Sequence, residues 1–433
     1  MLLVLMLPAC RDTDSGSGEL AGAEWDPRPE FWVWNASPRD LDPAASAHAL
    51  RWLAIEFPGG DQRALHRHLQ RDQLPAERGV VPVFRLPAGT RVLDDEDYRR
   101  AVVRQLKHWF GEQKAKALEL DYDCPTARLE DYAAWLTSLR DELGVERLSV
   151  TALASWVMAP EFGDFCGAVD ELCPMFYDLE PDSVQEVVSG EVRPLVDESS
   201  LEWIGRWRRC PIPWRAGLPN YTRLSLFAAD GSSLGHLHRW NQQALVSHPQ
   251  LELQEGARSE LQLLRALGDI RFADVSLHAG SYLIRRQPDS KRLIRAIEAA
   301  KEAGACGVIW FAHPASAPAA AYSVAHLEAL QEGVVPKPDL SHHFEADGTL
   351  VLTNRGPGDV LPRSDGQAHV LTIEAEAQRP FLNPAAGEFS GISAGARTVD
   401  ARMLRRIEWY YHGLPAGRSL RSEPGAVNMD RFY

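Results

Sequence analysis

Three carboxylates alternate along one predicted strand of the chain. Glu119, Asp121 and Asp123 occupy every second position of the run from Ala117 to Cys124. Because successive side chains of a strand point to opposite faces, these three share one face, with neighbouring Cα atoms about 6.6 Å apart. Their mutual repulsion inside a confined site would raise at least one pKa, as a general acid requires. A solvated strand edge or a structural ion-pair network is the alternative interpretation.

Eight apolar, β-rich runs alternate with helical patterns from residue 30 onward, and they predict the strands that position this face. The predicted strands are 31–35, 53–57, 80–86, 117–123, 148–153, 172–177, 215–221 and 306–311, and helical spacing is clear at 95–110, 129–143 and 290–303. Strict alternation of eight strands with helices predicts the fold class α/β, as a (β/α)8 barrel of the TIM type. In such barrels the active site lies at the carboxyl ends of the strands, where Asp123 falls.

The rest of the chain divides into an insertion and a C-terminal module. The stretch after the seventh strand is far longer than one βα unit needs, which predicts an insertion over about 224–290 within a barrel that spans 28–335. A Pro-rich linker then precedes a hairpin with a central Asp-Gly turn. This pattern predicts a small, β-sandwich-like, all-β module over 340–433.

The amino-terminal residues predict export and a lipid anchor. An apolar run ends in Leu7-Pro8-Ala9-Cys10, which resembles the bacterial lipobox and implies a signal peptide over 1–10 with lipid attachment at Cys10. A Gly/Ser/Asp-rich segment opens the predicted flexible linker over 11–27, as a tether needs. The resemblance implies a bacterial cell-envelope location, periplasmic or on the outer membrane, and a membrane partner reached through the lipid.

Composition excludes several classes of function. The chain has 433 residues, with 46 Lys and Arg against 60 Asp and Glu, and this net charge of -14 argues against a nucleic-acid partner because phosphates would be repelled. A hydrophobic share of 45% and a charged share of 24% are typical of a soluble globular protein. The cysteines and histidines match no metal-ligand spacing, and we expect neither a metal nor a cofactor. The five cysteines beyond Cys10 permit at most two disulfides in an exported protein, with a connectivity that cannot be deduced from sequence. For those in predicted barrel strands we expect the role of a small buried hydrophobic residue.

Aromatic residues near the predicted strand ends favour a carbohydrate ligand, because flat apolar rings match the C–H faces of sugars. The candidates are Trp32 or Trp34, Trp156, Tyr177, Tyr221 and Trp310. Each of them could instead belong to the core. Glu56 and Arg85 end the second and third strands and could either reach the same cavity or form a structural pair.

Several strand ends resemble those of family 18 glycoside hydrolases, the chitinases and their relatives. The run Glu119-x-Asp121-x-Asp123 is similar to the second half of the DxxDxDxE signature of that family. Further likenesses are Met175-Phe176-Tyr177-Asp178 on the sixth strand, Gly217 to Arg223 on the seventh and Gly307-Val308-Ile309-Trp310 on the eighth. The run from Leu118 through Trp156 resembles more closely a family of bacterial lipoproteins, domain of unknown function 3142, and that likeness covers about 30–315.

The resemblance to family 18 implies a role for each matching residue. Asp123 would be the acid/base and Asp121 its partner, Tyr177 and Asp178 would hold the transition state, and Trp310 would be the sugar platform. The remaining predicted substrate contacts are Glu119, Trp34, Trp156, Tyr221 and Arg223.

The chain departs from family 18 at the acid itself, because Asp123 stands where the family has Glu. Losing one methylene withdraws the carboxyl by about 1.5 Å, and a misplacement of about 1 Å can cost about 100-fold in rate. Three outcomes stay open: Asp123 acts on a substrate seated deeper, Asp121 or Asp178 forms a nucleophile and acid pair with it, or the barrel binds sugar without cutting it.

The sequence therefore predicts an exported barrel that hydrolyses or recognises a glycan through carboxylates at its strand ends. The alternative is a noncatalytic, lectin-like envelope lipoprotein on the same barrel. A third hypothesis is an envelope scaffold whose β module binds a protein partner.

Overall fold

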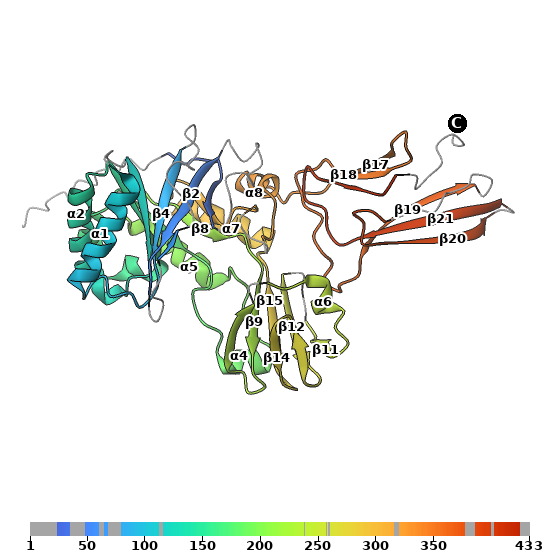
Figure 1. The fold of residues 1–433 in the computed structure, drawn as a ribbon, viewed down its shortest axis with the longest axis horizontal. Coiled ribbons are helices and arrows are strands. Elements are labelled where there is room, and N and C mark those ends of the chain that lie inside the picture. Colours follow the sequence, from blue (N-terminus) through green and yellow to red (C-terminus); the bar gives the residue numbers. More distant parts are fainter. Residues whose placement is uncertain are drawn as a thin grey trace, which may run out of the picture.

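The computed structural model describes most of the chain beyond residue 23, and Figure 1 gives its arrangement. The described residues are 24–34, 48–59, 65–67, 79–111, 116–237, 239–256, 258, 260–315, 320–376, 386–399 and 402–424. The predicted signal peptide, with Cys10, and most of the predicted linker lie outside them. Among the described residues, no helix has both the length and the apolar character needed to cross a membrane.

A closed barrel of parallel strands forms the centre of the fold. Its strands are β1 (Glu30–Val33), β2 (Ala49–Glu56), β4 (Val80–Leu86), β5 (Ala117–Tyr122), β6 (Arg147–Leu153), β7 (Glu171–Met175), β8 (Ala216–Pro219) and β16 (Val308–Phe311). Each strand pairs in parallel with the next, and β16 pairs back onto β1, so the sheet has no open edge among these eight. The short β3 (His66–Arg67) adds an antiparallel pairing on β2. The predicted (β/α)8 fold is confirmed.

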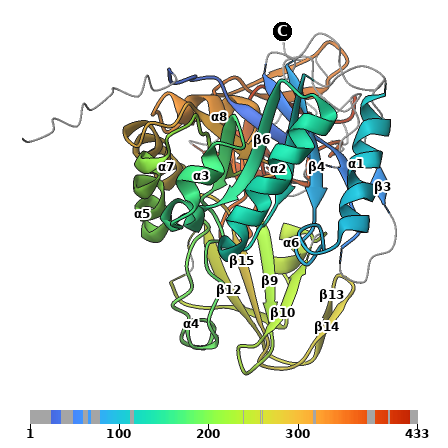
Figure 2. The same ribbon diagram turned by 90° about the vertical axis from the view of Figure 1, so that its left-hand side faces the viewer.

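Helices surround the barrel, and Figure 2 shows α1, α2 and α3 along one side of it. They are α1 (Glu96–Phe110), α2 (Leu129–Leu143), α3 (Phe162–Cys166), α5 (Glu198–Arg206), α7 (Ser290–Glu302) and α8 (Val324–Gln331). Asp95 caps α1 by accepting a hydrogen bond from the backbone N–H of Tyr98, 3.0 Å away. Apolar residues at helical spacing, such as Val102 and Leu106, face the strands. The three helices expected from the sequence begin and end within one residue of the prediction.

The two faces of each barrel strand have different neighbours. On β5, Leu118 and Leu120 are fully buried in the core between strands and helices, whereas Glu119 and Asp121 point into the barrel. This alternation is the geometric basis of the site, because only the inward face can line a cavity along the barrel axis.

The long connection between β8 and β16 forms a sheet-rich insertion, which confirms its prediction. Its strands are β9 (Arg223–Phe227), β10 (Ser233–Leu237), β11 (Leu251–Leu253), β12 (Leu261–Ala266), β13 (Ile270–Phe272), β14 (Val275–Leu277) and β15 (Tyr282–Arg286), with α6 (Gln242–Val246) between β10 and β11. Five strands make one antiparallel sheet in the order β10-β9-β15-β12-β11. The short α4 (Val184–Ser189) packs on this sheet through Val187, which contacts Phe227 and Ile284.

The C-terminal region is all β, as predicted. It comprises β17 (Leu340–Phe344), β18 (Leu350–Asn354), β19 (His369–Glu376), β20 (Gly391–Val399), β21 (Arg402–Tyr411) and β22 (Ser419–Arg421), arranged in two three-stranded antiparallel sheets. The expected Asp-Gly hairpin joins β17 to β18, with Phe344 opposite Leu350. Leu352 of one sheet and Trp409 of the other share one buried core.

Candidate active site

A cavity of about 180 Å³ opens at the carboxyl ends of the barrel strands. It is lined by Trp32, Trp34, Arg85, Asp121, Asp123, Thr151, Met175, Tyr177 and Phe311. Six of these nine lie in barrel strands, where alternation turns their side chains inward, and Trp34, Asp123 and Tyr177 lie just beyond strand ends. The cavity therefore stands where active sites of (β/α)8 barrels are found.

Asp121 is held from two sides by neighbouring strands. Its Oδ1 accepts a hydrogen bond of 2.8 Å from the Thr151 hydroxyl, and its Oδ2 lies 3.7 Å from Nε of Arg85. The side chain is only 13% exposed. Burial raises its pKa to about 6, against the opposing effect of Arg85 and with a further upward contribution from Asp123. Such a carboxyl can hold or release a proton near neutral pH.

Asp123 lies at the mouth of the cavity. The residue is exposed, yet the protein around it partly desolvates its carboxyl and raises its pKa, while Arg85 lowers it. Within the part of the chain that the structure describes, no side chain forms a hydrogen bond or an ion pair with Asp123. Its carboxyl is thus available to a ligand in a way that the carboxyl of Asp121 is not.

Aromatic rings form the walls. Phe311 stands edge-on to Trp34, with centroids 5.4 Å apart, and lies nearly parallel to the ring of Tyr177 at 6.1 Å. The guanidinium of Arg85 covers the ring of Trp34 at 4.9 Å. Burial raises the pKa of Tyr177 well above its usual value, so its hydroxyl stays protonated. Carboxylates beside flat apolar rings suit a ligand that has both hydroxyls and apolar faces, as a sugar does.

Asp178, Tyr221 and Arg223 gather beside the cavity without lining it. The Tyr221 hydroxyl donates to Oδ2 of Asp178 at 2.5 Å, and Nη1 of Arg223 lies 2.5 Å from the same oxygen. Asp178 has a left-handed backbone with φ of 51°, which is uncommon for a residue other than glycine. The carboxylate of Asp178 is thus already paired within the protein, and the cluster stabilises the loop that follows Tyr177. The ring of Tyr177 also contacts the ring of Tyr221 edge-on, with centroids 5.7 Å apart.

Two predicted sugar contacts, Trp310 and Trp156, point away from the cavity and into the core. Trp310 has no exposed surface and packs in the core between the strands and the helices, because β16 turns Val308 and Trp310 outward and Phe311 inward. Trp156 is equally buried in that core, where its Nε1 donates to the backbone oxygen of Cys124 at 3.0 Å. The placement of both tryptophans at the cavity is corrected, and Phe311 takes the position expected for Trp310.

Glu119 is also misplaced in the prediction, because it lies below the cavity and has no exposed surface. Its Oε1 accepts a hydrogen bond of 2.6 Å from Nε1 of Trp32, and its Oε2 pairs with Arg51. Glu119 therefore cannot contact a substrate. It supports the floor instead, since the indole that it holds lines the cavity and packs at contact distance over Gly217.

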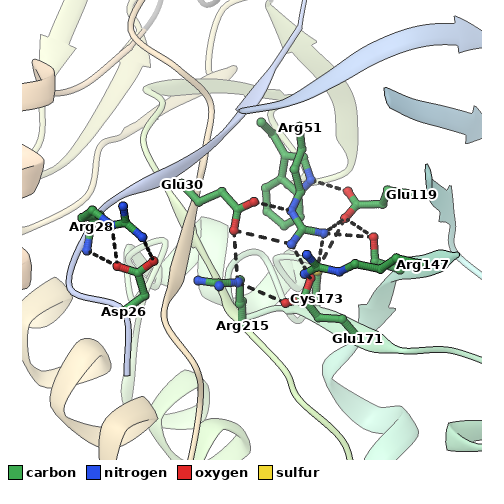
Figure 3. A network of polar contacts seen from close by, with 11 residues as sticks. Asp26, Arg28, Glu30, Arg51, Glu119, Arg147, Glu171, Cys173 and Arg215 are labelled. Atoms are coloured by element: carbon green, nitrogen blue, oxygen red, sulfur yellow. Dashed lines mark hydrogen bonds and ion pairs between the residues drawn. The ribbon is translucent and has the colours of Figure 1, made fainter. Parts of the chain in front are cut away.

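A buried charge network fills the lower half of the barrel (Figure 3). For Glu119 it matches the alternative interpretation, a structural ion-pair network, but its other members were not predicted. Arg51 lies at its centre, paired with Glu30, Glu119 and Glu171. Nε of Arg215 lies 3.1 Å from both Glu30 and Glu171, and Arg147 closes the network 2.8 Å from Glu171. Burial raises the pKa of Glu171, but Arg51, Arg147 and Arg215 together lower it to about 2.

The sequence did contain a signal for this network. Arg51 interrupts the apolar run of β2, and Glu30 and Glu171 each begin an apolar barrel strand. Lone charges in such strands are expected to be paired, because an unpaired buried charge is costly.

His313 and the described cysteines do not line the cavity. His313 is buried, and its Nδ1 accepts a hydrogen bond from the backbone N–H of Ala315 at 3.1 Å, so it caps the loop after β16. The five described cysteines are all buried, as expected for those in predicted barrel strands. Among the described residues, no group of three His, Cys, Asp or Glu side chains is arranged to hold a metal ion.

Solved structures with a similar arrangement include three chitinases. The C-terminal domain of a putative chitinase from Desulfitobacterium hafniense is 12% identical, with a TM-score of 0.47, over 71% of this chain and 98% of that one. A family GH18 chitinase from Chromobacterium violaceum is 10% identical, with a TM-score of 0.41, over 91% and 87%. Chitinase ChiA74 from Bacillus thuringiensis is 10% identical, with a TM-score of 0.44, over 91% and 100%.

Comparison at the level of sequence matches part of the chain to a protein family. No curated protein matches the chain. Residues 76–255, which run from just before β4 to just after β11, match the family described as Domain of unknown function (DUF3142). This match covers less than half of the chain and falls within the stretch whose sequence resembles that family.

Proposed function

We propose that the barrel cavity binds one sugar unit of a glycan and that Asp121 and Asp123 hydrolyse its glycosidic bond. The observation that carries the proposal is the joint presence, in one cavity, of two carboxyls with raised pKa and the rings of Trp34, Tyr177 and Phe311. Glycoside hydrolysis needs a pair of carboxyls in different protonation states, and aromatic walls suit the faces of a sugar.

The contacts divide the work between the two carboxyls. Asp123 lacks a partner among the described residues and lies at the mouth, so it protonates the glycosidic oxygen. Asp121, fixed by Thr151 and faced by Arg85, is the partner that stabilises the developing positive charge. Asp178 is not a member of this pair, because Tyr221 and Arg223 occupy its carboxylate.

A noncatalytic carbohydrate-binding function is the second candidate. The observation in its favour is the Asp at position 123, whose carboxyl reaches about 1.5 Å less far than that of a Glu. A barrel with this shorter acid and an intact aromatic wall would bind a sugar without cutting it.

A glycan-library assay separates the two candidates. We expect the wild type to release reducing ends from at least one glycan, and Asp123→Asn and Asp121→Asn each to lose at least about 100-fold of that rate. Asp141→Asn, an exposed change on α2, is the matched control and should keep it. Tight binding by the wild type without cleavage would favour the lectin-like function, and cleavage that survives Asp123→Asn would overturn the assignment of the acid.

We also propose that the chain is exported and anchored in the bacterial cell envelope through an acyl group on Cys10. The support is the lipobox-like run before Cys10 and the linker over 11–27, residues that lie for the most part outside the described structure. Mass spectrometry of the membrane fraction should detect a diacylated or triacylated amino-terminal cysteine. Cys10→Ser should release the protein from that fraction, and an intact Met1 on the wild type would contradict the proposal.

A further inference from the structure

A row of polar side chains crosses four neighbouring barrel strands at the level of Asp121. The strand register places Glu56 of β2 beside Arg85 of β4, and Arg85 beside Asp121 of β5. Thr151 of β6 completes the row by its hydrogen bond to Asp121. One cation thus stands between two carboxylates, and both Arg85 and Asp121 line the cavity.

Arg85 is equidistant from both carboxylates and hydrogen-bonded to neither. Its Nε lies 3.7 Å from Oε1 of Glu56 and 3.7 Å from Oδ2 of Asp121, beyond the usual hydrogen-bond range of about 2.7–3.2 Å. No other described residue forms a hydrogen bond with the guanidinium. The plane of Trp34 supports it at 4.9 Å, and the side chain is 39% exposed, so it has room to move sideways across the ring.

We propose that Arg85 is a positioning residue that shifts between Glu56 and Asp121 as Asp121 gains or loses its proton. When Asp121 is protonated, Glu56 is the stronger attraction for the guanidinium. When Asp121 is ionised, the guanidinium closes on Oδ2, the oxygen that Thr151 leaves open. The movement would stabilise the carboxylate at the moment the reaction needs it.

The other charged and titratable groups around Asp121 cannot take this role. Asp123 and Glu119 on its own strand are acidic, and the charge of Glu119 is already met by Arg51. Tyr177 after β7 and Tyr132 on α2 face it with hydroxyls that burial keeps protonated. Arg85 is the cation that acts on Asp121, and it opposes the effect of burial.

Carboxyl titration by carbon-13 NMR tests the proposal without requiring any activity. We expect Arg85→Gln to move the midpoint of Asp121 from about 6 to about 7, whereas Arg85→Lys stays near the wild type because the charge is kept. Glu56→Gln should move it downward, because the guanidinium is then left to Asp121. Arg295→Gln, a surface change that removes a pair with Glu198, should leave the midpoint unchanged.

A double-variant cycle separates the shifting guanidinium from simple charge repulsion by Glu56. If Glu56 acts through Arg85, Glu56→Gln should move the midpoint at least twice as far in the wild type as in the Arg85→Gln background. Equal shifts in both backgrounds would overturn the proposal, as would an unmoved midpoint in Arg85→Gln.

The role of Arg85 in catalysis rests on the proposed hydrolysis. If that hydrolysis occurs, the acidic limb of the pH–rate profile should move in each variant as the titration midpoint of Asp121 does. If the wild type cleaves no glycan, the proposed hydrolysis fails while the titration still decides the role of Arg85.

Discussion

At the scale of single residues, the buried environment of Asp121 gives its carboxyl a pKa suited to acid/base catalysis, and the same burial lowers the free energy of unfolding of the protein. Its pKa is raised from the ordinary 3.8 to about 6, chiefly by burial. A raised pKa means that the folded protein binds this proton more tightly than the unfolded chain does. Asp121 therefore lowers the free energy of unfolding as the pH rises from about 4 to about 6, and the cost persists above pH 6.

Replacing this carboxyl by a neutral isostere should stabilise the protein. We expect Asp121→Asn to raise the free energy of unfolding by about 1–3 kcal/mol at pH 7.5, since the amide oxygen can still accept from Thr151 and no buried charge remains. At pH 4 the gain should disappear. Urea unfolding at both pH values checks this, and an Asp121→Asn variant less stable than the wild type at pH 7.5 would contradict the account.

Single residues also mark where sequence reasoning was limited. The acids of β5 alternate with apolar residues, so their pattern fixes which face is inward. The run Val308–Phe311 of β16 is apolar throughout, and nothing in it distinguishes the two faces. A resemblance to a motif then placed Trp310 at the cavity, although a shift of one residue gives the position to Phe311.

At the scale of elements, the barrel strands position two layers of inward-facing side chains. The upper layer lines the cavity with Asp121 and Asp123, and the lower layer is the ion network around Arg51. All eight strands could be predicted, because apolar, β-rich runs and helical patterns alternate along the chain. The network around Arg51 could not be assembled from sequence, since Glu30, Arg51, Glu119 and Glu171 come from four strands and meet only when the barrel closes.

The network should make stability sensitive to the loss of its central cation. Arg51→Met leaves Glu119 and Glu171 buried without their central partner, and we expect a loss of about 3–5 kcal/mol in the free energy of unfolding at pH 7. Urea denaturation followed by circular dichroism measures it. Arg295→Met, which breaks an exposed pair on the surface, should change little.

Acid should weaken the same network. The pKa of Glu171 is lowered to about 2 from the ordinary 4.5, so its contribution to stability is complete above about pH 4.5 and is lost as the pH falls towards 2. The wild type should lose stability across that window, and the Arg51→Met variant should lose less. Parallel acid titrations of the two proteins would contradict this.

At the scale of the whole molecule, the three regions are joined by buried polar contacts. Asp359, from the C-terminal region, accepts hydrogen bonds from the backbone N–H and the hydroxyl of Ser323 at the start of α8, at 2.7 and 2.6 Å, and from the N–H of Ala416 at 2.7 Å. Gln262 of the insertion donates to the backbone oxygen of Ser364. The barrel and the C-terminal module were predicted from their residue patterns and the insertion from its length, but contacts between regions leave no such signal in the sequence.

A neighbouring constellation of Ser290, His326 and Asp359 joins α7, α8 and the C-terminal region. It is not a hydrolytic triad: Nδ1 of His326 accepts from the backbone N–H of Asp359 at 3.1 Å, so its Nε2 carries the proton that faces Ser290. Its role is to hold the regions together.

Removing the Asp359 carboxyl should loosen the C-terminal region from the barrel. We expect Asp359→Ala to cost about 1–3 kcal/mol, because partly buried donors at Ser323 and Ala416 lose their acceptor. Limited proteolysis should cut the segment between α8 and β17 faster in this variant. Asp365→Ala, an exposed change in the same region, is the control, and equal cleavage rates in both variants would contradict the role of Asp359.

The layered interior of the barrel also limits how any bound molecule can travel. Below the cavity, Trp32, Glu119 and the ion network around Arg51 occupy the barrel axis, so the side chains that the structure describes block the way to its other end. A sugar that enters must leave by the same opening. The product must then leave before the next ligand can enter. If product release is slow, it limits the rate of turnover, however fast the glycosidic bond is cleaved.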